Sequence, residues 1–470
     1  MDDVDTRGAA PPHHFLSSFW GAAGGDATAL EQVRFTGAGD LPSVFGVTDF
    51  AAASMAAAGL AVAELTRSLT RTPSGPARVQ VDRRQASFWF GLSVRPQAWE
   101  LPPIWDAVAG DYRARDGWIR LHTNAPHHRA AALDVLQVEP SRAAVAHAVQ
   151  GWAAQDLEAA VVARGGCAGA MQSWRQWQQH PQGRAVLQEP LLHWQATGAA
   201  ARGDWPFDPQ RPLAGIRVLD MTRVLAGPVA TRFLANLGAD VLRIDPPDWD
   251  EAVLEPEITI GKRCARLDLR APAGRQQCED LLQGADMLVH GYRSDALDRM
   301  GLGAEARQRL RPGLIDVSLD AYGFTGPWKA RRGFDSIVQM SMGFAEQGQR
   351  SAGADRPVPL PVQALDHATG YLMACAAVRA LQRRAADGVG SIVRASLART
   401  GAVLMAAGVG DVDTTSALAP ETTGDWADTI EHTPWGPARR LRWPIKIAGV
   451  RPGWSRPPVP LGSDTAQWSA

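Results

Sequence analysis

Two aspartates stand where an extended segment gives way to an apolar run that looks helical. Asp366 lies in PVQALDHATGYLMA (361–374), and Asp335 lies in RRGFDSIVQMSMG (331–343). A carboxylate can attack an activated acyl group and form a covalent intermediate. An aspartate at the start of a helix more often serves as an N-cap, which accepts hydrogen bonds from backbone N–H groups. The residues by themselves favour the N-cap and leave the nucleophile open.

Cationic residues gather in loops and element ends of the same half of the chain. They are Arg223, Lys262, Arg263, Arg299, Arg331 and Arg332. Arginine forks and ammonium charges match the oxygens of phosphate and carboxylate groups, so several of them around one crevice would hold an anionic ligand. Charged residues also populate loops for solubility alone, and that alternative stays open for each of them.

Three other chemistries are disfavoured. The turn at 222–228, TRVLAGP, has no G-x-G-x-x-G, so a nicotinamide dinucleotide is not expected even though Asp245 ends the next strand. No G-x-S-x-G elbow suggests a serine nucleophile. His122, His127 and His128 lack a nearby acid at ligand spacing, so we interpret them as a polar surface and expect no metal site.

Composition sets the broad class. The 470 residues are 45% hydrophobic, enough for two or three domains of a soluble globular protein. Lysine plus arginine (48) balances aspartate plus glutamate (49), so we expect neither nucleic acid nor an anionic membrane as a partner. We find no signal peptide and no run of about eighteen uninterrupted apolar residues, and the four cysteines form no C-x-x-C pair. We therefore expect a cytoplasmic protein with buried, unpaired cysteines.

Alternating strands and helices must position these side chains. IRVLDM (216–221) and ADVLRID (239–245) read as buried strands around the helix GPVATRFLANLG (227–238), and the alternation returns over 274–292 and 305–323. Such βαβ units predict a parallel sheet with ligands at the carboxyl ends of its strands. Residues 203–213, rich in proline and acids, read as a linker.

The first part of the chain contains an apparent half-repeat. Asp49 and Asp366 each begin an alanine-rich helix with an arginine near its end, followed by a glycine turn and a strand that contains Val79 or Val393. We interpret this as an internal duplication. Residues 111–136 read as strand, D-G turn, strand and helix, which predicts a small α+β unit.

Several motifs in register resemble the class III CoA-transferases, which include formyl-CoA transferase and carnitine CoA-transferase. The resemblance covers residues 213 to about 402 in collinear order. It is carried by LAGIRVLDMTRVLAGPVATRFLANLGADVLRIDPP, GKRCARLDLRAPAGR, ADMLVHGYRSDALDRMGLG, SLDAYGFTGPW, RRGFDSIVQMSMG and LDHATGYLMACAAVRALQRR.

The resemblance implies roles for individual residues. Asp366 matches the catalytic aspartate of the family, which forms a mixed anhydride and then an aspartyl-CoA thioester. The CoA site matches at Arg223, Val224, Leu225, Ala226, Lys262, Gly291, Tyr292, Arg299 and Arg332. Arg223 stands where the family commonly has histidine or another side chain. Pro246 stands where some members have an arginine that contacts CoA. The related racemases place an acid/base histidine where this chain has Phe334, so racemisation is disfavoured.

The expected fold is α/β, with a Rossmann-like CoA-binding domain over 214–470 and a half-repeat with a smaller α+β domain over 1–202, joined by the linker 203–213. The expected activity is CoA transfer between an acyl-CoA and a small carboxylic acid, in a homodimer. The alternatives are a CoA-binding protein without transferase activity and, less favoured, a racemase or isomerase. Asp49 is expected to be a decayed equivalent of Asp366, and the family's protective glycine-rich loop is not recognisable.

Overall fold

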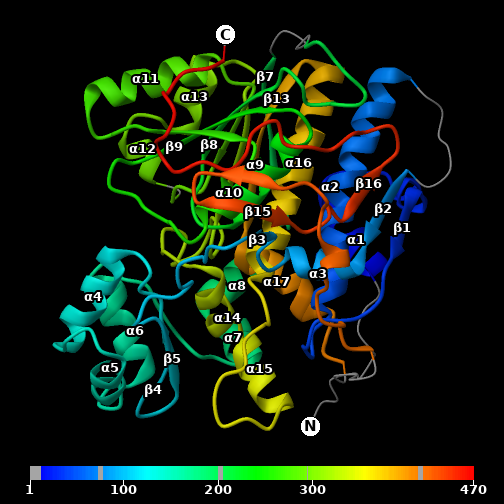
Figure 1. The fold of residues 1–470 in the computed structure, drawn as a ribbon. Coiled ribbons are helices and arrows are strands. Elements are labelled where there is room, and N and C mark those ends of the chain that lie inside the picture. The colour runs from blue at the N-terminus through cyan, green and yellow to red at the C-terminus, as the bar shows by residue number, and fades with distance from the viewer. Residues whose placement is uncertain (1–11, 72–77, 200–204, 294, 411–415, 470) are drawn as a thin grey trace.

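A seven-stranded sheet forms the centre of the molecule (Figure 1). The computed structural model describes residues 12–71, 78–199, 205–293, 295–410 and 416–469. The strand order is β10-β9-β8-β11-β12-β13-β7, and every neighbouring pair is parallel except β13 with β7. In that order the strands are Lys262–Arg266, Asp240–Asp245, Arg217–Met221, Met287–His290, Ile315–Asp320, Val389–Ser396 and His193–Ala199.

Helices cover both faces of this sheet. Val218 of β8 packs in one core with α9 (Ala226–Asn236) and α16 (Ala364–Asp387). The next residue, Leu219, packs in a second core with α11 (Pro272–Gln283). This second core also receives α12 (Ala296–Arg299), and α13 (Ala304–Leu310) packs against α11. Because successive side chains of a strand face opposite sides, the two cores define a three-layer α/β architecture.

The elements predicted for this half are confirmed. Strands β8 and β9 flank α9, and α11 with β11 and α13 with β12 overlap the two further predicted repeats of the alternation. The glycine expected after α9 is Gly238, whose φ of +107° lies in the region that glycine adopts most easily.

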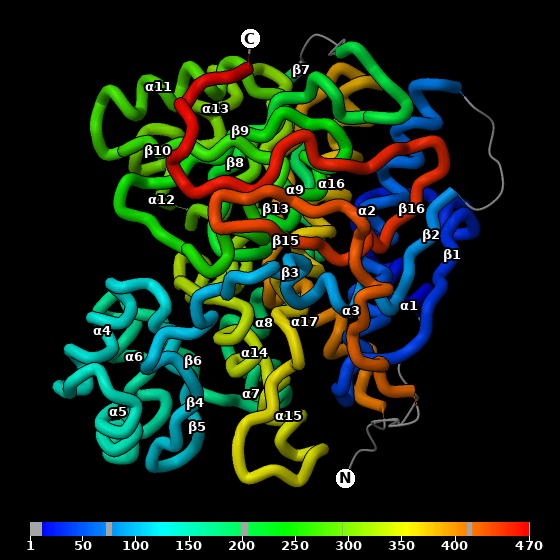
Figure 2. Tube along the Cα trace, viewed as in Figure 1, coloured from blue at the N-terminus to red at the C-terminus, as the bar shows by residue number. Residues whose placement is uncertain are grey.

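A smaller α+β body stands beside the large sheet, at the lower left of Figure 2. Strands β4 (Gly110–Arg113), β5 (Trp118–Leu121) and β6 (Ala168–Ala170) form its antiparallel sheet. Helices α4 (Pro126–Leu136), α5 (Arg142–Val149) and α6 (Ala154–Ala163) pack with them around a separate core. The small unit predicted over 111–136 is thus present.

The division expected at 203–213 does not separate two cores. Strand β7, from before that point, is the edge strand of the large sheet. Near the other end of the chain, β16 (Ile445–Ile447) pairs with β2 (Val79–Asp82), which also pairs with β1 (Val33–Thr36). Strand β15 (Gly436–Arg440) likewise joins β3 (Val94–Pro96) and β14 (Glu431–Thr433). The reason is packing, because one hydrophobic core runs from Phe15 to Val450. Residues 203 and 204 of the expected linker lie outside the described residues.

The two helices of the predicted half-repeat have matching local geometry. Helix α2 (Val47–Thr70) and α16 are each 24 residues long and carry an aspartate at their third position. Each ends at a left-handed residue, Arg71 or Gly388. Each is followed by a strand and a further helix, α3 (Arg83–Trp89) or α17 (Leu397–Ala406), and α2 packs directly against α16. A common origin of the two segments stays a prediction.

Helix α2 is long and apolar enough to cross a membrane by length and composition, and its whole apolar window is buried inside the protein, as in a core helix. The remaining elements connect and cover those above. They are α1 (Pro12–Ala22), η1 (Ala27–Gln32), α7 (Trp174–Gln179), α8 (Pro181–Gln188), α10 (Glu255–Ile258), α14 (Asp335–Met342), α15 (Phe344–Ser351) and η3 (Thr423–Asp425).

Candidate active site

Asp366 is buried in the first turn of α16, but it does not cap the helix. The capping carboxylate comes from another helix: Oδ2 of Asp335 accepts hydrogen bonds from the backbone N–H groups of Leu365 (2.7 Å) and Asp366 (2.9 Å). Among the described residues, none donates a hydrogen bond to the Asp366 carboxyl group. The N-cap interpretation is thus wrong for both aspartates, because neither caps its own helix: Asp335 begins α14 but accepts hydrogen bonds from the N-terminus of α16, and Asp366 has no such structural role.

Asp366 borders a cavity of about 370 Å³ at the carboxyl ends of the parallel strands. Met221 ends β8, Gly291 follows β11 and Asp320 ends β12, and all three line this cavity. Eight of the ten residues predicted for catalysis or CoA binding also line it: Arg223, Val224, Leu225, Ala226, Gly291, Tyr292, Arg332 and Asp366. This is the edge of a parallel sheet at which ligands bind in α/β proteins.

The turn between β8 and α9 enters this cavity in a strained conformation. Val224 has a φ of +63°, a value that a β-branched residue rarely adopts. Its backbone N–H donates to Oε2 of Glu251 at 2.8 Å, which holds the turn in place. Backbone strain of this kind collects at functional sites, and here it brings the first turn of α9 to the cavity wall.

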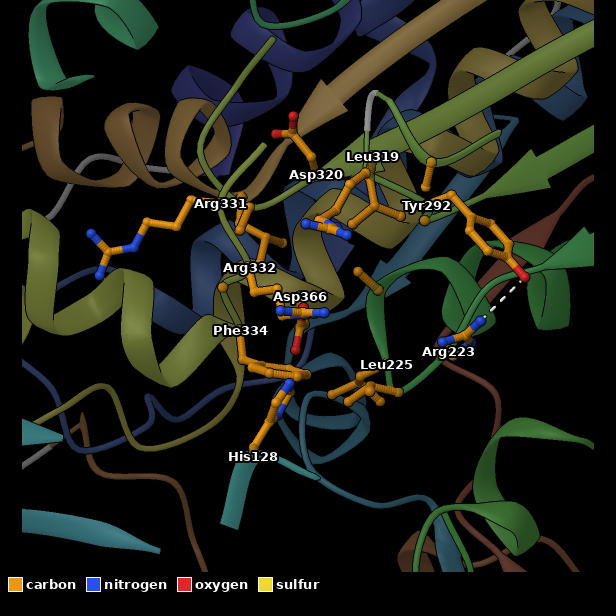
Figure 3. Close-up of a pocket in the computed structure, with 18 of the residues that line it drawn as sticks. His128, Arg223, Leu225, Tyr292, Leu319, Asp320, Arg331, Arg332, Phe334 and Asp366 are labelled. Atoms are coloured by element: carbon orange, nitrogen blue, oxygen red, sulfur yellow. Dashed lines mark hydrogen bonds between the residues drawn. The ribbon is translucent and has the colours of Figure 1, made fainter. Parts of the chain in front are cut away.

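Three arginines of the cavity wall have no carboxylate partner among the described residues: Arg223, Arg293 and Arg332. The Arg223 guanidinium lies 4.8 Å from the ring of Trp249 and 5.1 Å from that of Tyr292, and it donates to the Tyr292 hydroxyl at 3.2 Å (Figure 3). Burial lowers the pKa of Arg332, and the charge of Arg293 lowers it further. Unpaired guanidinium groups held in this way are suited to phosphate oxygens.

Two of the residues expected to bind CoA lie elsewhere. Lys262 is buried in β10, where Nζ contacts Asp220 Oδ2 at 2.9 Å and Thr231 Oγ1 at 2.7 Å, so it does not line the cavity. Arg299 is exposed on α12, pairs with Asp295 four residues earlier and does not line the cavity either. Neither residue joins the other predicted CoA contacts at the cavity: Lys262 is held in a buried ion pair with Asp220, and Arg299 is exposed to solvent.

Two buried carboxyl groups interact at the head of α16. Burial raises the pKa of Asp366 well above its usual range, and the adjacent Asp335 carboxylate raises it further. Burial also raises the pKa of Asp335, although the hydrogen bonds that it accepts from two backbone N–H groups and from the Gln339 side chain lower this pKa. Donors therefore favour the charge on Asp335, and Asp366 is the carboxyl group that holds its proton more tightly.

Two histidines pack against Phe334, next to Asp366. Phe334, which lies beside Asp366 in Figure 3, stacks on His122 with ring centroids 3.8 Å apart, and its ring lies 5.7 Å from that of His128. Burial lowers the pKa of both histidines to about 3, so both are neutral. The expectation of a polar surface is wrong for these two, because both are buried. Of the three histidines only His127 is exposed.

Among the described residues, no group of three or more His, Cys, Asp or Glu side chains is placed to hold a metal ion. All four cysteines are free and buried, as the sequence predicts.

A second cavity of about 390 Å³ meets the first at Asp366. The two share Val224, Leu225, Trp249, Phe334 and Asp366. Sequence reasoning missed this cavity and the aromatic wall formed by Trp249. The second cavity is built partly from 102–105, far from the recognised motifs, and only the exposed apolar residues of that segment could have marked it.

The sequence matches a known family over about half of the chain. Residues 213–433 match the model of CoA-transferase family III. An acetyl-coenzyme A transferase of Hypoxylon pulicicidum is 37% identical over 189 residues, which are 39% of this chain and 32% of that protein. A probable fatty acyl-CoA transferase of Mycobacterium tuberculosis is 32% identical over 204 residues, which are 40% of this chain and 51% of that protein. The chain thus spans between a third and about half of the length of these two relatives.

A solved structure of a CaiB/BaiF family protein from Brucella suis aligns with 26% identity and a TM-score of 0.38. The alignment covers 48% of this chain and 65% of that chain.

Proposed function

We propose that this protein is a CoA-transferase in which Asp366 accepts first an acyl group and then CoA while CoA passes between two carboxylic acids. One observation carries the proposal. Asp366 is a buried carboxyl group, free of hydrogen-bond donors among the described residues, at the meeting point of a cavity with three unpaired arginines and a second cavity. A nucleophile needs this freedom, because donors would stabilise its negative charge and reduce its reactivity.

The reaction needs four exchanges at carbonyl carbons. An Asp366 oxygen attacks the thioester carbon, the carbon–sulfur bond breaks, and CoA leaves as a thiolate from the mixed anhydride. The thiolate attacks the Asp366 carbonyl carbon, and the donor acid leaves as a carboxylate. The acceptor carboxylate then attacks this aspartyl-CoA thioester and releases the thiolate again. The thiolate finally attacks the acyl carbon of the new anhydride, which frees the Asp366 carboxylate and the new acyl-CoA.

CoA would lie in the arginine-lined cavity. Its phosphate groups suit the guanidinium groups of Arg223, Arg293 and Arg332, and Trp249 and Tyr292 flank Arg223. The reactive sulfur would then approach Asp366 at the junction with the second cavity. Exchange of one activated carboxyl for another is close to thermoneutral, so positioning and exclusion of water supply most of the catalysis.

Hydroxylamine trapping tests the proposal. An acyl-CoA should make the enzyme sensitive to hydroxylamine, because the anhydride and the aspartyl thioester are both converted to a hydroxamate at Asp366. Asp366→Asn should abolish transfer and trapping. Asp49→Asn is the matched control, since Asp49 holds the same position in α2, pairs with Arg83 and lines neither cavity. Transfer that survives in Asp366→Asn would refute the proposal.

A CoA-binding protein without transferase activity is the second candidate. The raised pKa of Asp366 favours it, because a protonated carboxyl group does not attack a thioester. The two candidates differ in a simple experiment. A binding protein would bind CoA with measurable affinity and show no modification of Asp366 at any pH at which it stays folded.

A further inference from the structure

The second cavity has an apolar wall. It is lined by 102–105, by 252–254 and by the shared residues Val224, Leu225 and Phe334. Among the described residues, the large apolar side chains that remain exposed are Ile104 (47%), Trp105 (36%) and Ile430 (46%), and the first two line this cavity. Exposed apolar side chains gathered at a cavity indicate an apolar ligand.

Three polar residues of this cavity lie near its junction with Asp366. They are Asp335, Ser336 and Gln363. Asp335 accepts a hydrogen bond from the first turn of α16, Ser336 is hydrogen-bonded to His122, and Gln363 immediately precedes α16. These groups surround the position at which a thioester carbonyl would react. The segments 102–105 and 252–254 offer hydrocarbon contacts, which suits an apolar chain.

The charges of the second cavity are negative. Its lining includes Asp106, Asp250 and Glu251 and contains no lysine or arginine. Two arginines outside the lining are already engaged with these acids, since Arg129 pairs with Asp106 at 3.0 Å and Arg243 pairs with Glu251. The histidine of the lining, His122, has a pKa lowered to about 3 by burial and is neutral. A second carboxylate on the acyl group would meet no free cation there.

Arg120 does not supply the missing cation. Its guanidinium lies 4.7 Å from the Trp105 ring, but it pairs with Asp111 at 2.8 Å and does not line the cavity. The cavity volume of about 390 Å³ equals on the order of a dozen water-sized groups, enough for a medium-length chain.

We infer that the second cavity is the acyl pocket and that it takes apolar monocarboxylic acyl groups in preference to dicarboxylic ones. This inference rests on the proposed function for the identity of the ligand. It follows from three features: an apolar wall beside the reactive carboxyl group, the absence of a free cation in the described lining, and acids where a distal carboxylate would lie. Each buried methylene of an apolar chain tightens binding about fourfold, whereas a buried unpaired carboxylate weakens it.

Equilibrium binding to the Asp366→Asn variant tests the pocket separately from catalysis. Titration calorimetry with octanoyl-CoA, succinyl-CoA and free CoA should give at least tenfold tighter binding of octanoyl-CoA than of succinyl-CoA. In the unaltered enzyme, kcat/KM should favour octanoyl-CoA by a similar factor. Equal or tighter binding of succinyl-CoA would overturn the inference.

Two matched variants locate the preference. Ile104→Arg places a cation in the second cavity and should reduce the octanoyl-to-succinyl preference at least fivefold. Ile430→Arg changes a residue that is equally exposed and lines neither cavity, so the preference should stay unchanged. If Ile104→Arg leaves the preference unchanged, the second cavity is not the acyl pocket. If octanoyl-CoA binds preferentially but hydroxylamine never modifies Asp366 in the unaltered enzyme, the proposed function fails and the assignment of the pocket stands.

Discussion

At the scale of single residues, two carboxyl groups divide two tasks at the head of α16. Asp335 accepts hydrogen bonds from the backbone N–H groups of Leu365 and Asp366, and these bonds stabilise its charged form despite burial. Asp366 has no such donors, so burial and the Asp335 charge raise its pKa. In the proposed mechanism Asp335 is therefore a positioning residue, and its charge would also set the pH at which Asp366 ionises and can act as a nucleophile.

The first prediction concerns this pH dependence. Because Asp366 must ionise before it attacks, kcat/KM should rise with pH through a range above that of an ordinary aspartate. Asp335→Asn keeps an acceptor oxygen for the two N–H groups but removes the charge, so the pKa of Asp366 falls and the rising limb moves to lower pH. At the acidic end of the profile, kcat/KM should increase about threefold or more. A pH–rate series on both proteins measures this, and a profile that does not move would contradict the coupling.

The second prediction concerns stability. The raised pKa of Asp366 means that the folded state holds a proton that the unfolded chain has already released. Stability is then fully present below the unfolded pKa and declines as pH rises through the folded pKa. Asp366→Asn removes this loss, so at neutral pH its Tm should exceed that of the unaltered protein by on the order of 1–3 °C. The difference should vanish in acid. A lower Tm at pH 7 would indicate that Asp366 has a structural role.

At the scale of elements, local sequence patterns were enough to predict those segments whose structure is set by their own residues. Strands β8 and β9 and helix α9 follow from β-branched runs and from glycine and proline at the ends. The turn 222–226, Gly291 with Tyr292, and the head of α16 were placed at one cavity by family resemblance. The role of Asp335 as a cap for α16 could not be predicted, because the acid and the N–H groups that it accepts lie thirty residues apart.

The third prediction concerns Lys262, which the family resemblance assigns to the CoA site and which the structure places in a buried ion pair with Asp220. Lys262→Met leaves the Asp220 charge buried without its partner, so it should destabilise the fold by on the order of 3 kcal/mol. At a temperature where the variant is still folded, its KM for acyl-CoA should be unchanged, because Lys262 does not line the cavity. Denaturant unfolding and steady-state kinetics measure the two effects.

Arg299→Ala is the control for this experiment. Arg299 is an exposed member of a surface ion pair, so its removal should change stability by less than about 0.5 kcal/mol. A Lys262→Met protein of normal stability but strongly raised KM would restore Lys262 to the CoA site.

At the scale of the whole molecule, the two halves of the chain interpenetrate. Strand β7 edges the large sheet, strand β16 pairs with β2, and α2 packs along α16. The second cavity depends on this arrangement, because 102–105 come from the first half of the chain and Asp366 from the second. Sequence patterns could not predict it, since non-local pairings leave no periodicity in the chain.

The fourth prediction follows from this interpenetration. A fragment that lacks residues 1–202 should not fold cooperatively, because it loses β7 and exposes the face of α16 that α2 covers. Circular dichroism melts and backbone amide exchange of the fragment should show no sharp transition. A cooperative melt close to that of the full chain would support the division at 203–213 as a true domain boundary. The homodimer implied by the family resemblance stays a prediction, which the solution mass will test.

The most direct test of the central claim is the site of CoA attachment. After incubation with octanoyl-CoA and rapid acid quenching, peptide mapping by mass spectrometry should find CoA bound as a thioester to the peptide that contains Asp366. The corresponding peptide that contains Asp49 should stay unmodified. CoA attached elsewhere, or an unmodified Asp366 in protein that transfers CoA, would contradict the account.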